Sequence, residues 1–306
     1  MVSLTTASGI TVDTFEVAPA DFDLESATLE ERARFGFAAF EDAPALRRRL
    51  NGQHRGYRFI APTFGAEESR DAVRADVNLS LKSAEDAEAA PVTLPTWAGA
   101  AVPGSPAAPI CWIQGGWTVP SVQVPPGIPG EYFAACPWVG IDGLNNATNI
   151  LQVGCAARIG AGTAPYAFWY QWRPGGSQPI PNFPIAAGDA ISATIKLAPG
   201  SNSSAGILLA NDSKRVRCNF GVAAAPGSPV AGVSGEWVVE FVQTLGHLAD
   251  FGILTFTSCA VGAATGASTD LRSATPLFMV DGFRNVLADS QITNPASVAV
   301  RFVRSA

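Results

Sequence analysis

Charged side chains are scarce in this sequence, and their scarcity excludes one class of partner at once. Only 15% of the 306 residues are charged, and the formal net charge is −6. Nucleic-acid-binding proteins carry clustered Lys and Arg that neutralise phosphates. We therefore exclude a nucleic-acid partner.

Histidine is rarer still, since His54 and His247 are the only two, and no CxxC pair occurs. A His/Cys zinc site needs clustered ligands, so we expect no metal and no cofactor. Because the number of cysteines is odd, at least one thiol has no partner within the chain. Two roles stay open for these residues, as buried small hydrophobes or in one or two disulfides. They are Cys111, Cys136, Cys155, Cys218 and Cys259.

Long apolar segments are also missing. The long uncharged stretch from Leu94 to Gly130 is interrupted repeatedly by Pro and Gly, which excludes a membrane-spanning helix. The first fifteen residues, MVSLTTASGITVDTF, have neither the basic start nor the apolar core of a signal peptide. We therefore expect no membrane partner, and these residues give no support for export.

What the chain does have is 47% hydrophobic residues with 30 Gly and 23 Pro, a composition typical of short strands and tight turns. From Trp97 onward, short β-like runs alternate with turns rich in Gly, Pro, Asn and Asp, such as RPGGSQP and APGSNSS. Many strands at short intervals predict an antiparallel sandwich of two sheets. The fold class is therefore mainly β, with a small mixed or helical segment at the N-terminus.

The N-terminal third differs from the rest in charge. Residues 1–94 hold 10 Lys and Arg against 16 Asp and Glu, whereas residues 95–306 hold 10 of each. We place a boundary near Leu94, with an N-terminal segment at 1–94 and a β-sandwich domain at 95–306. Ser26 or Thr28 is expected to cap a helix, and Pro44 to open a second one. The polar stretch from Gly65 to Ala90 is interpreted as a flexible connection.

The three arginines of this segment, Arg47 to Arg49, have two interpretations. They form a solvated helix face, or they belong to a propeptide that covers a cleft and pairs with its carboxylates until acid protonates them.

Two strands of the second part carry polar groups on one face. In PWVGIDGLNNATNILQVG (137–154), alternation along the second strand points the Gln152 side chain to one face and the side chains of Leu151 and Val153 to the other. In SGEWVVEFV, it puts Glu236 and Glu240 on one face and the apolar residues between them on the other. A carboxylate and an amide on two strands can share one groove.

These runs resemble the glutamic peptidases, also called eqolisins. WVGIDG is followed by ILQVG, with Gln152 fourteen positions after Trp138. Other motifs of the family follow in order over about residues 95 to 306: TWAGAAV before these two, then FWYQWRP, GDAISATI, GEWVVE and ADFGILTF after them. By this resemblance Gln152 and Glu236 are the catalytic pair, and Trp138 and Asp142 line the cleft.

We add further groove residues to the expected substrate-binding set, which comprises Trp97, Trp138, Asp142, Trp169 and Gln171. The sequence also departs from the family pattern. Gln171 stands where the family has a Glu, and Phe241 follows Glu240 where an Asp is usual.

The resemblance implies a concanavalin A-like jelly roll and an acid-acting endopeptidase. Its carboxylate would serve as base and then acid, and its amide would stabilise the oxyanion. Polypeptide substrates, a monomer and an extracellular location are also expected. Two alternatives stay open: a noncatalytic lectin-like module that binds carbohydrate or peptide, and a degenerate peptidase.

Overall fold

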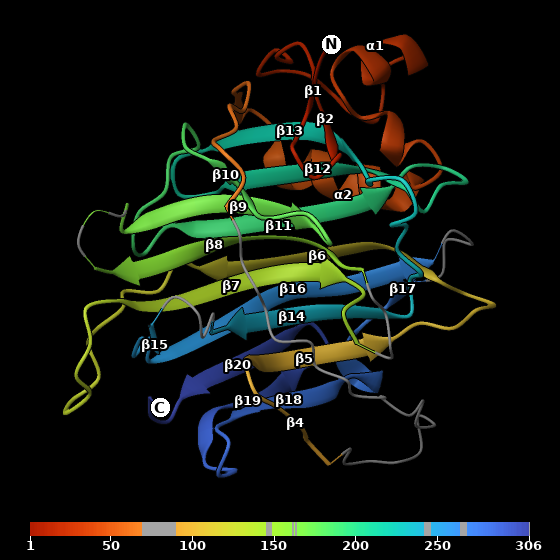
Figure 1. Ribbon diagram of the computed structural model, residues 1–306. Helices are drawn as coiled ribbons and strands as arrows, with labels where there is room; N and C mark the ends of the chain where they lie inside the picture. The colour runs from red at the N-terminus through yellow and green to blue at the C-terminus, as the bar shows by residue number, and fades with distance from the viewer. Residues whose placement is uncertain are drawn as a thin grey trace.

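The computed structural model describes residues 1–68, 90–144, 149–160, 162, 164–241, 246–263 and 268–305, and it is mainly β (Figure 1). The predicted fold class is confirmed: two layers of largely antiparallel strands pack face to face, with the helices confined to the N-terminal segment. In the part of the chain so described, no helix is both long and apolar enough to cross a lipid bilayer.

The first layer carries the candidate site. In spatial order its strands are β10 (Gln178–Ile180), β9 (Tyr166–Trp172), β8 (Leu151–Ile159), β7 (Phe133–Ile141), β14 (Ser234–Glu240), β5 (Trp97–Pro103), β18 (Thr275–Val280), β19 (Val286–Asn294) and β20 (Ser297–Phe302). Two short strands pair in parallel with this layer: β15 (His247–Leu248) with β7, and β4 (Val92–Leu94) with β18.

The second layer runs in the order β1 (Val2–Thr5), β2 (Thr11–Thr14), β13 (Val216–Ala223), β12 (Ser204–Asn211), β11 (Ala190–Leu197), β6 (Ile110–Thr118), β16 (Ile253–Ala263) and β17 (Ser268–Thr269). The short β3 (Arg58–Phe59) pairs in parallel with β13. Strand β16 joins the layers, because its first half pairs with β20 and its second half with β6 after a register shift.

The hydrophobic core fills the space between the layers. As the alternation predicts, β9 directs Phe168, Tyr170 and Trp172 into it, and β14 directs Trp237 and Val239 into it. The opposite face of the first layer carries a second, smaller apolar cluster, made of Leu94, Trp97, Ala101, Cys136, Trp138, Leu144, Ile150, Ala156, Trp169, Val238 and Leu277. Both faces of this layer are therefore buried, and its polar residues lie among apolar ones.

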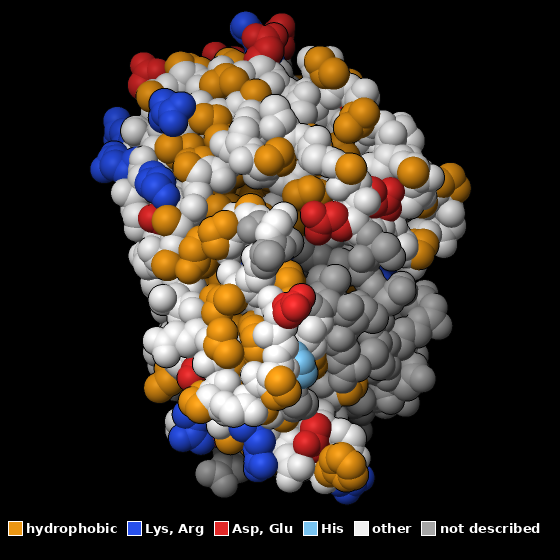
Figure 2. Space-filling model, turned by 60° about the vertical axis from the view of Figure 1, so that its left-hand side comes forward, with side chains coloured by type: hydrophobic (Ala, Val, Ile, Leu, Met, Phe, Trp, Pro, Cys, Tyr) orange, Lys and Arg blue, Asp and Glu red, His pale blue; other side chains and the backbone are white. Residues whose placement is uncertain are grey.

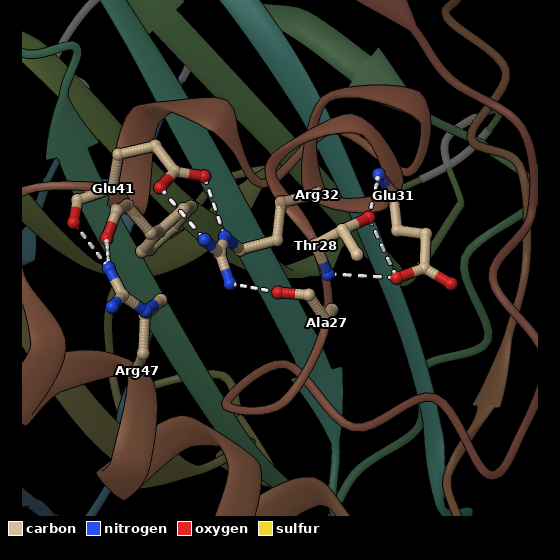
Figure 3. A network of polar contacts seen from close by, with 7 residues as sticks. Ala27, Thr28, Glu31, Arg32, Glu41 and Arg47 are labelled. Atoms are coloured by element: carbon tan, nitrogen blue, oxygen red, sulfur yellow. Dashed lines mark hydrogen bonds and ion pairs between the residues drawn. The ribbon is translucent and has the colours of Figure 1, made fainter.

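The N-terminal segment is built onto the second layer. Hairpin β1–β2 extends that layer beyond β13, and helices α1 (Leu29–Arg34) and α2 (Pro44–His54) lie beside it (Figure 1). The short 3-10 helix η1 (Ala38–Phe40) lies between α1 and α2 in the sequence, and a second one, η3 (Leu271–Ser273), lies near the C-terminus. Thr28 caps α1 in a capping box with Glu31, and Pro44 opens α2, both as predicted. Figure 3 shows this box beside the ion pair of Arg32 and Glu41.

The start of the expected flexible connection is instead paired with the first layer. Gly65 donates its backbone N–H to Pro179, and Glu68 exchanges backbone hydrogen bonds with Ser177, so residues 65–68 run along the edge of β10. The prediction of a flexible connection is wrong for these residues, because they satisfy an open sheet edge. Residues 69–89 of that stretch lie outside the described residues.

All five cysteines are buried, and none is bonded to another. Of the two roles left open by the sequence, the structure places them as small buried side chains; Cys155, for example, accepts a hydrogen bond from the Trp117 indole at 3.4 Å. Burial raises the pKa of the Cys155 thiol to about 12, so this thiol stays protonated at neutral pH.

Candidate active site

Gln152 and Glu236 lie in one cross-strand row on the same face of the first layer. Glu236 on β14 is opposite Gly140 on β7, Gly140 is opposite Gln152 on β8, and Gln152 is opposite Gln171 on β9. Residues directly opposite one another in a sheet point to the same side. With neighbouring strands about 4.8 Å apart, the backbones of Glu236 and Gln152 are roughly 10 Å apart. Their side chains therefore project from the same face of the sheet, on either side of Gly140.

Gly140 places no side chain between the carboxyl and the amide. A Cβ at this position would lie 2.9 Å from the Trp138 ring and 3.1 Å from the Cβ of Gln152. Any larger residue would therefore push on both neighbours and project between the carboxyl and the amide. The sequence analysis missed this residue, although the Gly-Ile-Asp-Gly run contains it.

The Glu236 side chain is fully buried, at 0% exposed. Neither of its carboxyl oxygens has a hydrogen-bond partner among the residues that the structure describes. Burial raises the pKa of Glu236 well above its usual value, the nearby Ser234 hydroxyl acts to lower it, and the neighbouring Asp142 raises it further. The side chain is closed off from bulk water, and its charged form is disfavoured.

The Gln152 amide is oriented by a chain of donors. Its Nε2 donates to Oε1 of Gln171 at 2.7 Å, and Nε2 of Gln171 donates to the carbonyl of Gly175 at 2.8 Å. Because a backbone carbonyl only accepts, it forces Gln171 to present its oxygen and Gln152 to present its nitrogen. This chain uses one of the two amide hydrogens of Gln152.

This chain explains why a Gln can stand where the resemblance expects a Glu. Gln171 is 3% exposed and still offers an oxygen to the Gln152 amide, as a carboxylate would. Unlike a carboxylate, it adds no negative charge that would oppose ionisation of Glu236.

Trp97 and Trp138 converge on a second buried carboxylate that the sequence analysis did not assign. Their indole N–H groups donate to the two oxygens of Glu240 at 3.1 and 3.0 Å. The two rings meet edge to face, with centroids 4.9 Å apart and planes at 80°. Trp169, also proposed to bind substrate, lies in the same apolar cluster and is 1% exposed.

Asp142 anchors the loop that leads into β14. Its carboxylate accepts backbone N–H groups of three consecutive residues, Ala231, Gly232 and Val233, the last at 2.7 Å. Burial raises its pKa, although these hydrogen bonds act in the opposite direction. The residue adopts a left-handed backbone with φ of 70°, which Asp tolerates better than most residues. These contacts of Asp142 fix the loop that precedes β14.

The three arginines of the N-terminal segment lie away from this row. Arg47 on α2 donates to the carbonyls of Phe40 and Glu41 (Figure 3), Arg48 is exposed, and Arg49 donates to the carbonyl of Ser258 in the second layer. Among the described residues, Arg47 and Arg49 donate to backbone carbonyls rather than to the carboxylates of the site.

Charged side chains are unevenly placed on one face of the molecule. On the face in Figure 2, Lys and Arg side chains gather toward the upper and lower ends, with mainly hydrophobic and uncharged side chains between them. Within the described ranges, no group of three or more His, Cys, Asp and Glu side chains is placed to hold a metal ion.

The fold is that of the glutamic peptidases. The model of the Peptidase A4 family matches residues 95–302, and the chain belongs to this family, that of the eqolisins. The N-terminal segment lies outside the match.

Individual relatives agree with this assignment. Aspergillopepsin-2 of Aspergillus niger is 29% identical over 225 residues, which are 68% of this chain and 77% of that protein. The structure of aspergilloglutamic peptidase from Aspergillus niger is 28% identical, with a TM-score of 0.51 over 56% of this chain and 99% of that one. Scytalido-glutamic peptidase, solved with a transition state analog inhibitor, shares the fold at 23% identity, with a TM-score of 0.58 over 68% of this chain and 98% of that one.

Proposed function

We propose that this protein is an acid-acting endopeptidase in which Glu236 and Gln152 perform the chemistry. The observation that carries the proposal is the shared row: both side chains project from one face of the sheet on either side of Gly140, in a family of peptidases. Polypeptides are its substrates.

The reaction begins with Glu236 as a carboxylate. It takes a proton from a water molecule, whose oxygen attacks the carbonyl carbon of the scissile peptide. Gln152 donates its remaining N–H to the oxygen on which negative charge develops, and one such donor is typically worth about 10²–10³ in turnover. Glu236, now a carboxylic acid, gives its proton to the leaving amine as the C–N bond breaks.

The burial of Glu236 determines when this reaction can start. A base must be ionised, and burial disfavours the charged form of Glu236. Contact with water and substrate would restore solvation and bring the pKa back toward its ordinary range, so the group would exchange between carboxylate and acid most easily in mildly acidic solution.

The test is hydrolysis of denatured casein by the full chain and by its variants between pH 2 and 7. We expect acid-dependent cleavage that is abolished in Glu236→Gln and reduced by about 10²–10³ in Gln152→Ala, the loss typical of one oxyanion donor. The exposed Glu131→Gln is the matched control, since it removes one carboxylate outside the row. Intact casein at every pH would reject the proposal and favour the noncatalytic binding module or the degenerate peptidase.

An extracellular location and a monomeric state stay predictions that accompany this proposal. Secretion would suit an enzyme that works in acid. Size-exclusion chromatography with light scattering checks the monomer, and immunodetection in the culture medium checks the location.

A further inference from the structure

We propose that Glu67, from the N-terminal segment, is a positioning residue for Gln152, and that it acts through the peptide group between Gly175 and Gly176. This inference rests on the proposed function, because it assigns a role in placing the amide of the catalytic pair. Glu67 lies outside residues 95–302, so the family match says nothing about it.

The Glu67 carboxylate ties two backbone segments together. Its Oε1 accepts the N–H of Gly176 at 2.5 Å, and its Oε2 accepts the N–H of Ser8 at 3.2 Å. Burial acts to raise the pKa of Glu67, but the hydrogen bonds from Ser8 and Gly176 outweigh it and hold the pKa below its usual value. The carboxylate is therefore charged while it accepts these bonds, which makes them stronger than neutral ones.

The same peptide group meets the catalytic row on its other side. The N–H of Gly176 and the carbonyl of Gly175 belong to one planar unit. Its N–H points to Glu67, and its carbonyl accepts the Gln171 amide that in turn accepts from Gln152. A negative charge at the N–H end polarises the unit and makes its carbonyl a better acceptor.

The fit of the two segments leaves the peptide little freedom. A Cβ on Gly176 would lie 2.5 Å from the carbonyl oxygen of Glu68 and 2.7 Å from the Cγ of Glu67. A Cβ on Gly175 would lie 2.6 Å from the Ser8 hydroxyl. Pairing of Glu68 with Ser177 continues the contact along the edge of β10. The N-terminal segment thus sets the direction of the carbonyl that orients both amides.

Removing the Glu67 carboxylate should let this peptide rotate. Gln171 would then lose its fixed acceptor, and its side-chain amide could rotate by a half turn. As a result, the Gln152 amide would direct its nitrogen toward Gln171 in some molecules and its oxygen in others. Only the stabilisation of the oxyanion depends on that orientation, so turnover suffers and substrate binding does not.

The experiment compares Glu67→Ala, Glu67→Gln and Glu68→Ala in the full chain. We expect kcat to fall about tenfold in Glu67→Ala with KM unchanged, part of the 10²–10³ that one oxyanion donor supplies. Glu67→Gln keeps an acceptor oxygen and should retain most of the turnover. Glu68→Ala removes the neighbouring carboxylate, whose oxygen lies 3.8 Å from Arg158, and should leave kcat unchanged. Equal kcat in Glu67→Ala and the parent, or an equal loss in Glu68→Ala, would overturn the inference.

A second readout does not depend on activity. In ¹H–¹⁵N spectra, the Gly176 backbone signal and the side-chain amide signals of Gln152 and Gln171 should shift in Glu67→Ala and stay in place in Glu68→Ala. If no casein is cleaved but these shifts occur, the proposed function fails and the coupling stands. If casein is cleaved and the Gln152 signals do not move, the coupling fails and the function stands.

Discussion

The protonation of Glu236 links the closed site to the stability of the fold. Burial raises its folded pKa above the ordinary value of 4.5. Below that value the group is protonated in both the folded and unfolded states and has no effect on pH dependence. Above it the unfolded chain loses the proton while the folded chain keeps it, so stability falls as pH rises up to the folded pKa. A buried acid of this kind makes the closed protein more stable in acid.

Glu236→Gln should remove that dependence, because an amide of the same shape never ionises. We expect its melting temperature to equal that of the parent near pH 4 and to exceed it increasingly toward pH 7. Asp142 is present in both proteins, and its coupling to the Glu236 carboxyl, which raises the pKa of Glu236, adds to the expected difference. Thermal scans by circular dichroism at several pH values measure the effect. A difference that is the same at every pH would contradict it.

At the scale of elements, the entry into β14 depends on Asp142. Its carboxylate holds the N–H groups of three successive residues, 231 to 233, just before the strand that carries Glu236. A buried donor left without an acceptor costs about 1–3 kcal/mol. Asp142→Ala should therefore lose about 2 kcal/mol or more in urea unfolding, whereas Asp142→Asn keeps one acceptor and the left-handed backbone and should lose less. A loss within about 0.5 kcal/mol, typical of surface changes, would contradict this role.

How far the sequence predicts these elements depends on the range of the interaction. Strand faces follow a local period of two, so the directions of Gln152, Glu236 and Tyr170 could be read from their neighbours and are confirmed. The family motifs added the catalytic pair to that pattern. The pairing of Trp97 with Glu240 joins residues 143 apart, and no local pattern encodes it.

Other features escaped prediction for similar reasons. Gly140 matters because of what lies on both sides of it, which depends on the register of three strands. Residues 65–68 are polar and resemble a loop, yet they satisfy the edge of β10 through backbone groups that have no sequence signature.

At the scale of the whole molecule, the N-terminal segment and the β-sandwich share one core. Phe22, Phe37, Phe40 and Phe59 are buried in the same cluster as Trp237 and the other inward side chains of the first layer. Phe37 stacks on Phe22 with centroids 5.6 Å apart and meets Phe40 at 5.9 Å. Because one core serves both parts, the described residues 1–68 are expected to fold and unfold together with the sandwich.

Phe40→Ala tests that expectation, because the mutation lies in the N-terminal segment and the tryptophan fluorescence that reports on it comes from the β-sandwich. All seven tryptophans lie at or beyond Trp97, so their fluorescence reports only on the sandwich. Phe40 is 0% exposed, and truncating a buried Phe to Ala costs about 3–5 kcal/mol. If the two parts form one cooperative unit, the urea midpoint seen by tryptophan fluorescence should fall by the full amount and coincide with the midpoint seen by circular dichroism. Phe283→Ala is the control, since Phe283 is 90% exposed and its removal should change stability by less than about 0.5 kcal/mol. An unchanged fluorescence midpoint in Phe40→Ala, with a separate early transition by circular dichroism, would mean that the N-terminal segment unfolds on its own. A propeptide that can be removed without loss of the enzyme must behave in this way.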